Sequence, residues 1–229
     1  PDWFNADGGT DTEYPTKDYL EAISKMGNEA ESIFQKATEE VIKDQIECGI
    51  DILTDGEVRR ENYIHYHCRY LEGIDFNKLT KKVARTGNYE CWLPTITNKV
   101  SAKDAFLVNE WQLAQKMSSK PVKITIPGPM TITDTISNEF YNSPKEMGED
   151  LAEAIKVEID RLAKAGCKYI QVDEPLFARK PKEALEFGVQ NLEKCFEGIL
   201  NQDIEKITHI CCGYPDKLDA VNYPKAPLN

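Results

Sequence analysis

The sequence predicts an α/β protein whose fold is a (β/α)8 barrel, incomplete in this chain. Short apolar segments alternate with amphipathic helical segments of about 12 to 20 residues, a pattern typical of parallel sheets. Polar residues gather directly after the predicted strands, in "TDGE", "IPGPMTITD", "QVDEP" and "HICCGYPD". The C-terminal mouth of a barrel collects polar residues in this way. A doubly wound sheet is the alternative architecture that the same strands allow.

The first half of the chain is predicted to contain two helices and three strands. Apolar residues recur at helical spacing before Gly49, which ends the first helix. Val122, Ile124 and Ile126 alternate as in a strand, and Pro127 ends that pattern. In chain order we expect a helix at 29–48, a strand at about 50–54, an irregular segment at 75–92, a weaker strand at about 93–98, a helix at 102–118 and a strand at 122–126.

The second half repeats the helix-then-strand order twice. "SPKE" at 143–146 predicts a helix start, with Ser143 as N-cap and Glu146 completing a capping box. Strands are expected at about 168–172 and 206–211, the latter after a helix that begins near residue 181. A complete barrel has eight strands and typically about 250 residues. We therefore expect the 229 residues to be a single truncated barrel domain that lacks the first strand and the last two.

Composition restricts the partners and the compartment. Acidic residues outnumber basic ones 39 to 28, and the net charge of −11 disfavours nucleic acid or an anionic membrane as a partner. No apolar run approaches the roughly 20 residues of a membrane span. The seven cysteines lack the regular spacing of a disulfide framework, so we expect reduced thiols. A cytoplasmic location is the resulting expectation.

The segment "KITHICCGY" at 206–214 carries a candidate metal pair. On a strand, His209 and Cys211 share one face, while Cys212 faces the other way. Imidazole nitrogen and thiolate sulfur are both good ligands for Zn²⁺. The alternative is a hydrogen-bonded core histidine beside a buried thiol. A second set, His65, His67 and Cys68, is weaker, because on a helix none of its pairs has the i, i+4 spacing; its charged, aromatic surroundings suggest a surface or substrate-facing segment.

Acidic pairs follow two of the predicted strands. Asp55 and Glu57 lie in "TDGE", and Asp173 and Glu174 lie in "VDEP". Carboxylates at the mouth of a barrel are candidates for binding a cation or a substrate ammonium, or for moving protons. The alternative is capping of helix N-termini, a common role of Asp.

Four motifs taken together resemble a known family. "ILTDGE", "IPGPMTITD", "YIQVDEP" and "THIC", in this order and at these separations, resemble the C-terminal catalytic domain of cobalamin-independent methionine synthase and its single-domain relatives. The resemblance implies a zinc enzyme on a (β/α)8 barrel that transfers a methyl group from 5-methyltetrahydrofolate, often polyglutamylated, to homocysteine. By position, His209 and Cys211 match zinc ligands. Glu57 and Asp173 match residues that hold the amino group of homocysteine, and Glu174 follows in the same substrate-binding motif.

The sequence also departs from this family. The resemblance implies a further Glu and a second Cys as zinc ligands beyond the H-x-C pair, and neither follows in this chain. Two protein ligands would hold zinc weakly, so the chain as it stands is expected to be incomplete or inactive. Other interpretations are transfer to a different thiol, a corrinoid methyl donor, or a non-catalytic barrel that binds folate or another ligand.

Overall fold

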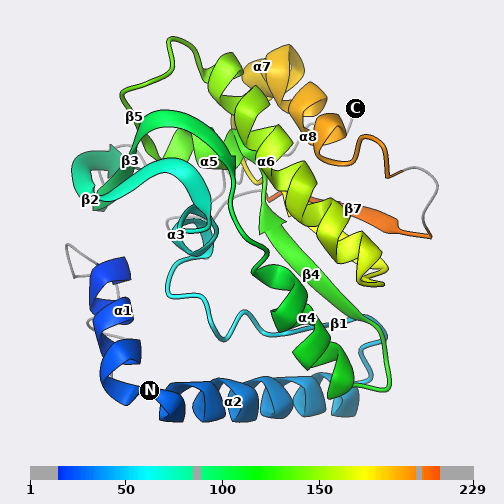
Figure 1. Cartoon of the computed structure of the whole chain (residues 1–229). Coiled ribbons are helices and arrows are strands. Elements are labelled where there is room, and N and C mark those ends of the chain that lie inside the picture. Colours follow the sequence, from blue (N-terminus) through cyan, green and yellow to red (C-terminus); the bar gives the residue numbers. More distant parts are fainter. Residues whose placement is uncertain (1–14, 85–88, 200–202, 212–229) are drawn as a thin grey trace, which may run out of the picture.

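The computed structural model describes residues 15–84, 89–199 and 203–211 (Figure 1). The helices are α1 (Pro15–Met26), α2 (Asn28–Glu47), α3 (Tyr63–Cys68), α4 (Leu107–Lys116), α5 (Pro129–Thr135), α6 (Pro144–Lys164), α7 (Pro181–Glu183), the π-helical turn η2 (Ala184–Gly188) and α8 (Val189–Cys195). The strands are β1 (Leu53–Thr54), β2 (Leu71–Ala84), β3 (Tyr89–Ala102), β4 (Val122–Pro127), β5 (Ser137–Asn138), β6 (Tyr169–Asp173) and β7 (Glu205–His209). None of the described helices is long and apolar enough to cross a bilayer.

A parallel sheet carries the candidate site. Its strand order is β1-β4-β6-β7, and all three pairings are parallel. Each strand is preceded in the chain by a helix, α2, α4, α6 and α8 respectively. The order never reverses, unlike that of a doubly wound sheet. Four of the five predicted strands are therefore confirmed, in an α/β fold with a parallel sheet. Over the described ranges the four strands form an open sheet, not a closed barrel.

The predicted strand at 93–98 belongs elsewhere, which corrects the predicted architecture. It lies within β3, which pairs antiparallel with β2 and parallel with the short β5 in a separate three-stranded sheet. The segment 75–92, expected to be irregular, belongs to β2 and β3 apart from the undescribed 85–88. The β2–β3 register shifts between Glu72 and Ile74 and again between Asp75 and Leu79. These shifts break the two-residue alternation by which a strand is recognised in a sequence.

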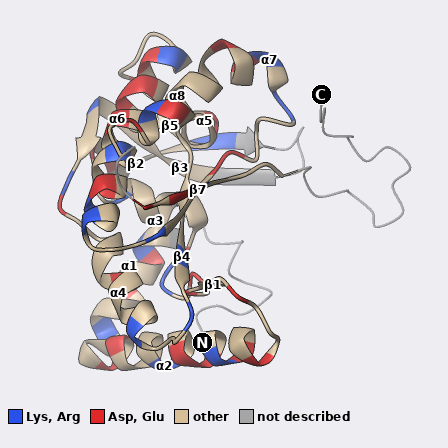
Figure 2. Ribbon diagram, turned by 90° about the vertical axis from the view of Figure 1, so that its right-hand side faces the viewer, with Lys and Arg blue, Asp and Glu red and all other residues tan. Residues whose placement is uncertain are grey.

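One face of the parallel sheet packs against helices. Its strands contribute apolar side chains to a single core that includes Trp111 of α4 and Leu151 of α6. The indole Nε1 of Trp111 also donates a hydrogen bond of 3.0 Å to the Val122 carbonyl, which fixes α4 on β4. Charged residues of both signs lie along α2 and α6 (Figure 2). The parallel sheet contributes six residues to this core: Leu53, Val122, Ile124, Ile126, Ile170 and Val172.

The start of α6 follows the predicted capping chemistry. The Ser143 hydroxyl accepts a hydrogen bond of 3.2 Å from the Glu146 amide, and Pro144 is the first helical residue. An apolar stripe along α6 is buried, formed by Leu151, Ile155, Ile159 and Leu162. Four cysteines with described side chains are free thiols, as predicted: Cys48, Cys68, Cys167 and Cys195.

Candidate functional site

The candidate site lies at the carboxyl edge of the parallel sheet. Glu57 follows β1, Asp173 ends β6, and His209 ends β7 beside it, since Asp173 and His209 are register partners. Along β4 and β6, Lys123, Thr125, Gln171 and Asp173 alternate with the core residues and therefore face away from the helices. The structure thus gathers three of the five predicted site residues, Glu57, Asp173 and His209, at one edge.

Glu57 is held by two neighbouring groups. Its Oε1 accepts hydrogen bonds from Arg60 Nη1 at 2.9 Å and from Thr125 Oγ1 at 2.5 Å. The Arg60 side chain is only 1% exposed, whereas that of Glu57 is 38% exposed. Glu57 also has a φ of 54°, the only positive φ of a non-glycine residue in the described chain. Such backbone strain is often found at binding sites, where surrounding contacts maintain it.

The turn before Glu57 is closed by Asp55. Its Oδ1 accepts a hydrogen bond of 3.0 Å from the Glu57 amide, and the residue is buried. This is an Asx turn and not the helix N-cap of the alternative interpretation, because residues 56–59 form a turn and no helix begins there. Asp55 therefore shapes the loop that presents Glu57.

Asp173 is buried, and its Oδ1 accepts a hydrogen bond of 2.6 Å from Gln171 Nε2. Burial raises the pKa of the Asp173 carboxyl, and the Glu57 charge acts in the same direction, whereas the Gln171 hydrogen bond and the His209 charge oppose the rise. The buried Tyr63 hydroxyl lies beside Asp173, and burial together with that carboxylate raises the Tyr63 pKa. The site therefore combines two carboxylates, an imidazole and a phenol.

Glu174, the neighbour of Asp173, points the other way. It is fully buried, and its oxygens accept hydrogen bonds from the amide of Met130 at 2.9 Å and from the amide and hydroxyl of Thr131 at 3.0 and 2.7 Å. Burial raises its pKa to about 7, although these hydrogen bonds oppose the rise. Within the described residues, Glu174 acts on the site by anchoring the loop between β4 and α5.

His209 and Cys211 are the donors for the expected zinc. β7 ends at His209, two residues before the predicted end, so the strand alternation that placed both side chains on one face does not extend to Cys211. His209 is exposed and Cys211 half-buried, so His209 is not the core histidine of the alternative reading. Nitrogen and sulfur are the right donor types, but no group of three or more His, Cys, Asp or Glu in the described ranges could hold a metal. Cys212 lies outside those ranges.

The segment "YIHYHCRY" was expected to be a surface or substrate-facing segment. It forms α3, and the burial of its ring-bearing face corrects the surface interpretation, while Tyr63 of the same helix lies beside Asp173 at the candidate site. His65, Tyr66, His67 and Cys68 are all buried. His67 Nδ1 lies 3.0 Å from the Tyr63 carbonyl, and burial lowers the His67 pKa well below its usual value. Burial likewise raises the pKa of the Cys68 thiol. The Tyr66 ring packs with those of Tyr70 and Phe106 in an aromatic cluster, with ring centroid distances of 4.1 to 6.1 Å.

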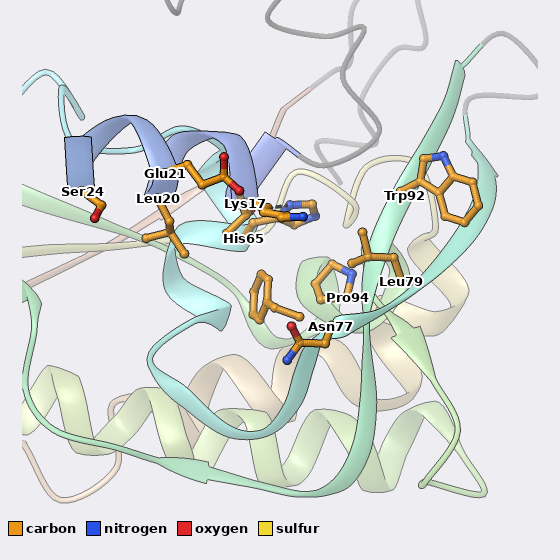
Figure 3. A pocket seen from close by; sticks show the side chains of 11 residues that line it. Lys17, Leu20, Glu21, Ser24, His65, Asn77, Leu79, Trp92 and Pro94 are labelled. Atoms are coloured by element: carbon orange, nitrogen blue, oxygen red, sulfur yellow. Dashed lines mark hydrogen bonds between the residues drawn. The ribbon is translucent and has the colours of Figure 1, made fainter. Parts of the chain in front are cut away.

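A cavity of about 310 Å³ lies elsewhere, between α1, α3, β2 and β3 (Figure 3). Its lining is mainly apolar, including Leu20, Phe76 and Leu79, with His65 beside α1 and Trp92 at one edge. Its size suits a small organic molecule. Neither Glu57, Asp173 nor His209 lines it.

Arg60, Tyr63, Thr125 and Gln171 were not predicted as site residues. Arg60 and Tyr63 lie several residues after β1 in the chain. They reach the site because α3 packs against β4. Thr125 and Gln171 were within reach of sequence reasoning, because polar residues alternating with Ile and Val mark a polar face of each strand.

Carboxylates and an imidazole lie at the carboxyl edge of a parallel sheet, the place where α/β domains bind their ligands, and this defines the class as an α/β domain with a candidate ligand site. The sequence model of one protein family, described as "Cobalamin-independent synthase, Catalytic domain", matches residues 11–223. The methionine synthases of Saccharolobus solfataricus and Sulfolobus acidocaldarius are 34% and 32% identical to this chain over 196 residues, or 85% of it. The chain belongs to this family of cobalamin-independent synthases.

Solved structures agree with this assignment. The B12-independent methionine synthase from Shewanella sp. W3-18-1, in complex with selenomethionine, matches with a TM-score of 0.76 and 32% identity, over 82% of this chain and 54% of that chain. A putative synthase from Listeria monocytogenes, 19% identical, supports the fold with a TM-score of 0.67. The chain covers 57% and 56% of the two curated relatives, and so spans little more than half of their length.

Proposed function

We propose that this chain provides much of the active site of a zinc-dependent methyltransferase that moves a methyl group from 5-methyltetrahydrofolate, possibly polyglutamylated, to the thiol of homocysteine. The family assignment supports the reaction class. In this proposal the open sheet is part of a (β/α)8 barrel, and the enzyme works in the cytoplasm. The single observation that carries the proposal is the convergence of Glu57, Asp173 and His209 at one edge of the sheet.

The two carboxylates bind the ammonium group of the amino-acid substrate. Glu57 and Asp173 interact electrostatically, and each is already oriented by a polar neighbour. An ammonium placed between them would neutralise their mutual repulsion, and partial burial strengthens the attraction compared with bulk water. Binding at this end would leave the thiol of the substrate directed toward the His209 side of the site.

His209 and Cys211 would hold the zinc, with the remaining ligands supplied by residues outside the described ranges. Zinc bound there would ionise the acceptor thiol at neutral pH. The described residues provide two donors of suitable chemistry. The chain's own contribution is to orient the substrate, because transfer requires the sulfur to be in line with the methyl group.

Metal analysis tests the zinc assignment. When zinc is added, the unaltered chain should bind it, and this binding should be lost in His209→Ala and in Cys211→Ser. Cys48→Ser is the matched control, because Cys48 is a free thiol that is exposed at the end of α2, away from the sheet edge. Zinc retained in both site variants would contradict the assignment of these ligands.

Ligand binding tests the substrate class. We expect L-methionine to bind more tightly than 4-(methylthio)butanoate, which lacks the amino group, as measured by calorimetry. Asp173→Asn should weaken L-methionine binding by roughly 30-fold or more, since removing one member of a buried charge pair is costly. Binding of folate without any amino-acid discrimination would support a non-catalytic binder instead. Methyl transfer to another thiol, or from a corrinoid donor only, would assign a different reaction.

A further inference from the structure

Asp173 is the end of a chain of hydrogen bonds that crosses two strands. Lys123 Nζ on β4 donates to Gln171 Oε1 on β6 at 2.6 Å, and Gln171 Nε2 donates to Asp173 Oδ1 at 2.6 Å. Gln171 and Asp173 are two residues apart on one strand and so share a face. Lys123 is the register partner of Tyr169 and thus the diagonal neighbour of Gln171. Long side chains on one face reach such a diagonal neighbour.

The chemistry of the two ends fixes the orientation of the Gln171 amide. Lysine can only donate hydrogen bonds, and an ionised carboxylate can only accept them. The amide oxygen must therefore face Lys123 and the amide nitrogen must face Asp173. Both bonds involve a charged group, so they are stronger than bonds between neutral partners. This arrangement fixes one oxygen of Asp173 and leaves the second oxygen outside the chain of bonds.

Glu57 is oriented in a parallel manner. Thr125, which donates to Glu57, is the register partner of Gln171, which donates to Asp173. Two adjacent positions of the sheet therefore each hold one of the two carboxylates. The two donors, Thr125 and Gln171, are therefore spaced by β4 and β6, whereas Glu57 itself reaches Thr125 from the turn after β1.

From this geometry we propose that Lys123 and Gln171 are positioning residues that hold Asp173 for the ammonium group of the substrate, and so set the preference for amino-acid thiols over thiols without an amino group. The inference rests on the proposed function. Neither residue contacts substrate itself. Their loss should weaken recognition of the amino group and leave recognition of the thioether unchanged.

The test compares two ligands on variants of the full chain. Gln171→Met keeps a similar side-chain volume but removes both hydrogen bonds, and Gln190→Met is the matched control at an exposed position of α8. By calorimetry, Gln171→Met should bind L-methionine about tenfold more weakly, the low end for a hydrogen bond to a charged group. Its affinity for 4-(methylthio)butanoate should equal that of the unaltered chain and of Gln190→Met.

Lys123→Met provides an independent second variant, because it leaves Gln171 and Asp173 in place. It should show a smaller loss in the same direction, also confined to L-methionine. Equal weakening of both ligands, or of neither, in the Gln171 and Lys123 variants would overturn the positioning role. An unaltered chain that does not distinguish the two ligands would overturn the proposed function, and this inference with it. If the unaltered chain distinguishes the two ligands and the variants distinguish them equally well, the positioning role is overturned while the proposed function stands.

Discussion

The connection between β4 and α5 depends on the absence of a side chain at Gly128. A Cβ added there would lie 2.3 Å from the Cδ and Oε1 atoms of Glu174 and 2.6 Å from its Cγ. Glu174 cannot move aside, because it is fully buried and holds three hydrogen bonds to Met130 and Thr131. The backbone cannot move aside either, since the Gly128 amide donates to the Asp173 carbonyl at 2.8 Å. We therefore predict that Gly128→Ala destabilises the fold strongly.

The magnitude follows from two costs. The φ of −76° and ψ of 161° at Gly128 suit alanine, so the backbone itself adds no penalty. Overpacking costs about 1–3 kcal/mol. Each hydrogen bond lost from a charged buried group costs about 1.5–3 kcal/mol. With at least one such bond lost, the free energy of unfolding should fall by about 3 kcal/mol or more, a large share of the roughly 5–15 kcal/mol of a typical domain.

Urea unfolding followed by circular dichroism measures this loss. Gly49→Ala is the control: its φ is 78°, but no atom lies within 4 Å of the added Cβ, so only the positive-φ cost of about 1 kcal/mol applies. A Gly128→Ala variant that loses no more stability than Gly49→Ala would refute the reasoning. In a Glu174→Ala background the Gly128 substitution should cost much less, because the clashing carboxylate is gone.

Three further predictions concern buried polar groups. Burial raises the pKa of both Glu110 and Glu174 from 4.5 to about 7, so between these values each carboxyl binds more protons in the folded chain than in the unfolded one and contributes a loss of stability as pH rises. Burial lowers the pKa of His65 and His67, which contributes a gain of stability over part of the same range. The stability of the unaltered chain relative to Glu110→Gln, measured by urea unfolding, should therefore fall as pH rises from about 4.5 to 7. Glu158→Ala should cost about 1–3 kcal/mol in the same assay, because its Oε1 accepts from the Phe106 and Leu107 amides at the start of α4. Asn62→Ala should lower the free energy of unfolding by about 1 kcal/mol, because the N-cap of α3 is lost. An unchanged urea midpoint would contradict this capping role.

The helices and parallel strands were predictable because their patterns are local. The capping residues at 143–146 and the alternation at 122–126 depend only on neighbours in the chain, and both are confirmed. β2 was not recognised, and only 93–98 of β3 was, because their pairing includes two register shifts, and long strands with such shifts lose the alternation of burial. The burial of α3 was missed for a related reason. Whether an aromatic, histidine-containing helix faces solvent depends on its partners, here Tyr70 and Phe106.

The candidate site shows the same limit at the scale of single residues. From the sequence, Asp173 and Glu174 were predicted to form one acidic pair that faces a substrate. Successive residues at a strand end project in opposite directions, so Asp173 joins the polar face with Gln171 while Glu174 turns toward α5. Chain alternation alone would have separated the two carboxylates. The alternation would not have shown that Glu174 accepts hydrogen bonds from the amides of Met130 and Thr131. These bonds join residues that are 44 and 43 positions apart in the chain. Asp173 can thus face a ligand, whereas Glu174 holds the loop between β4 and α5 in place. A variant that removes Glu174 should therefore act mainly by disturbing the Gly128–Asp173 backbone hydrogen bond, and only secondarily by changing the charge at the site.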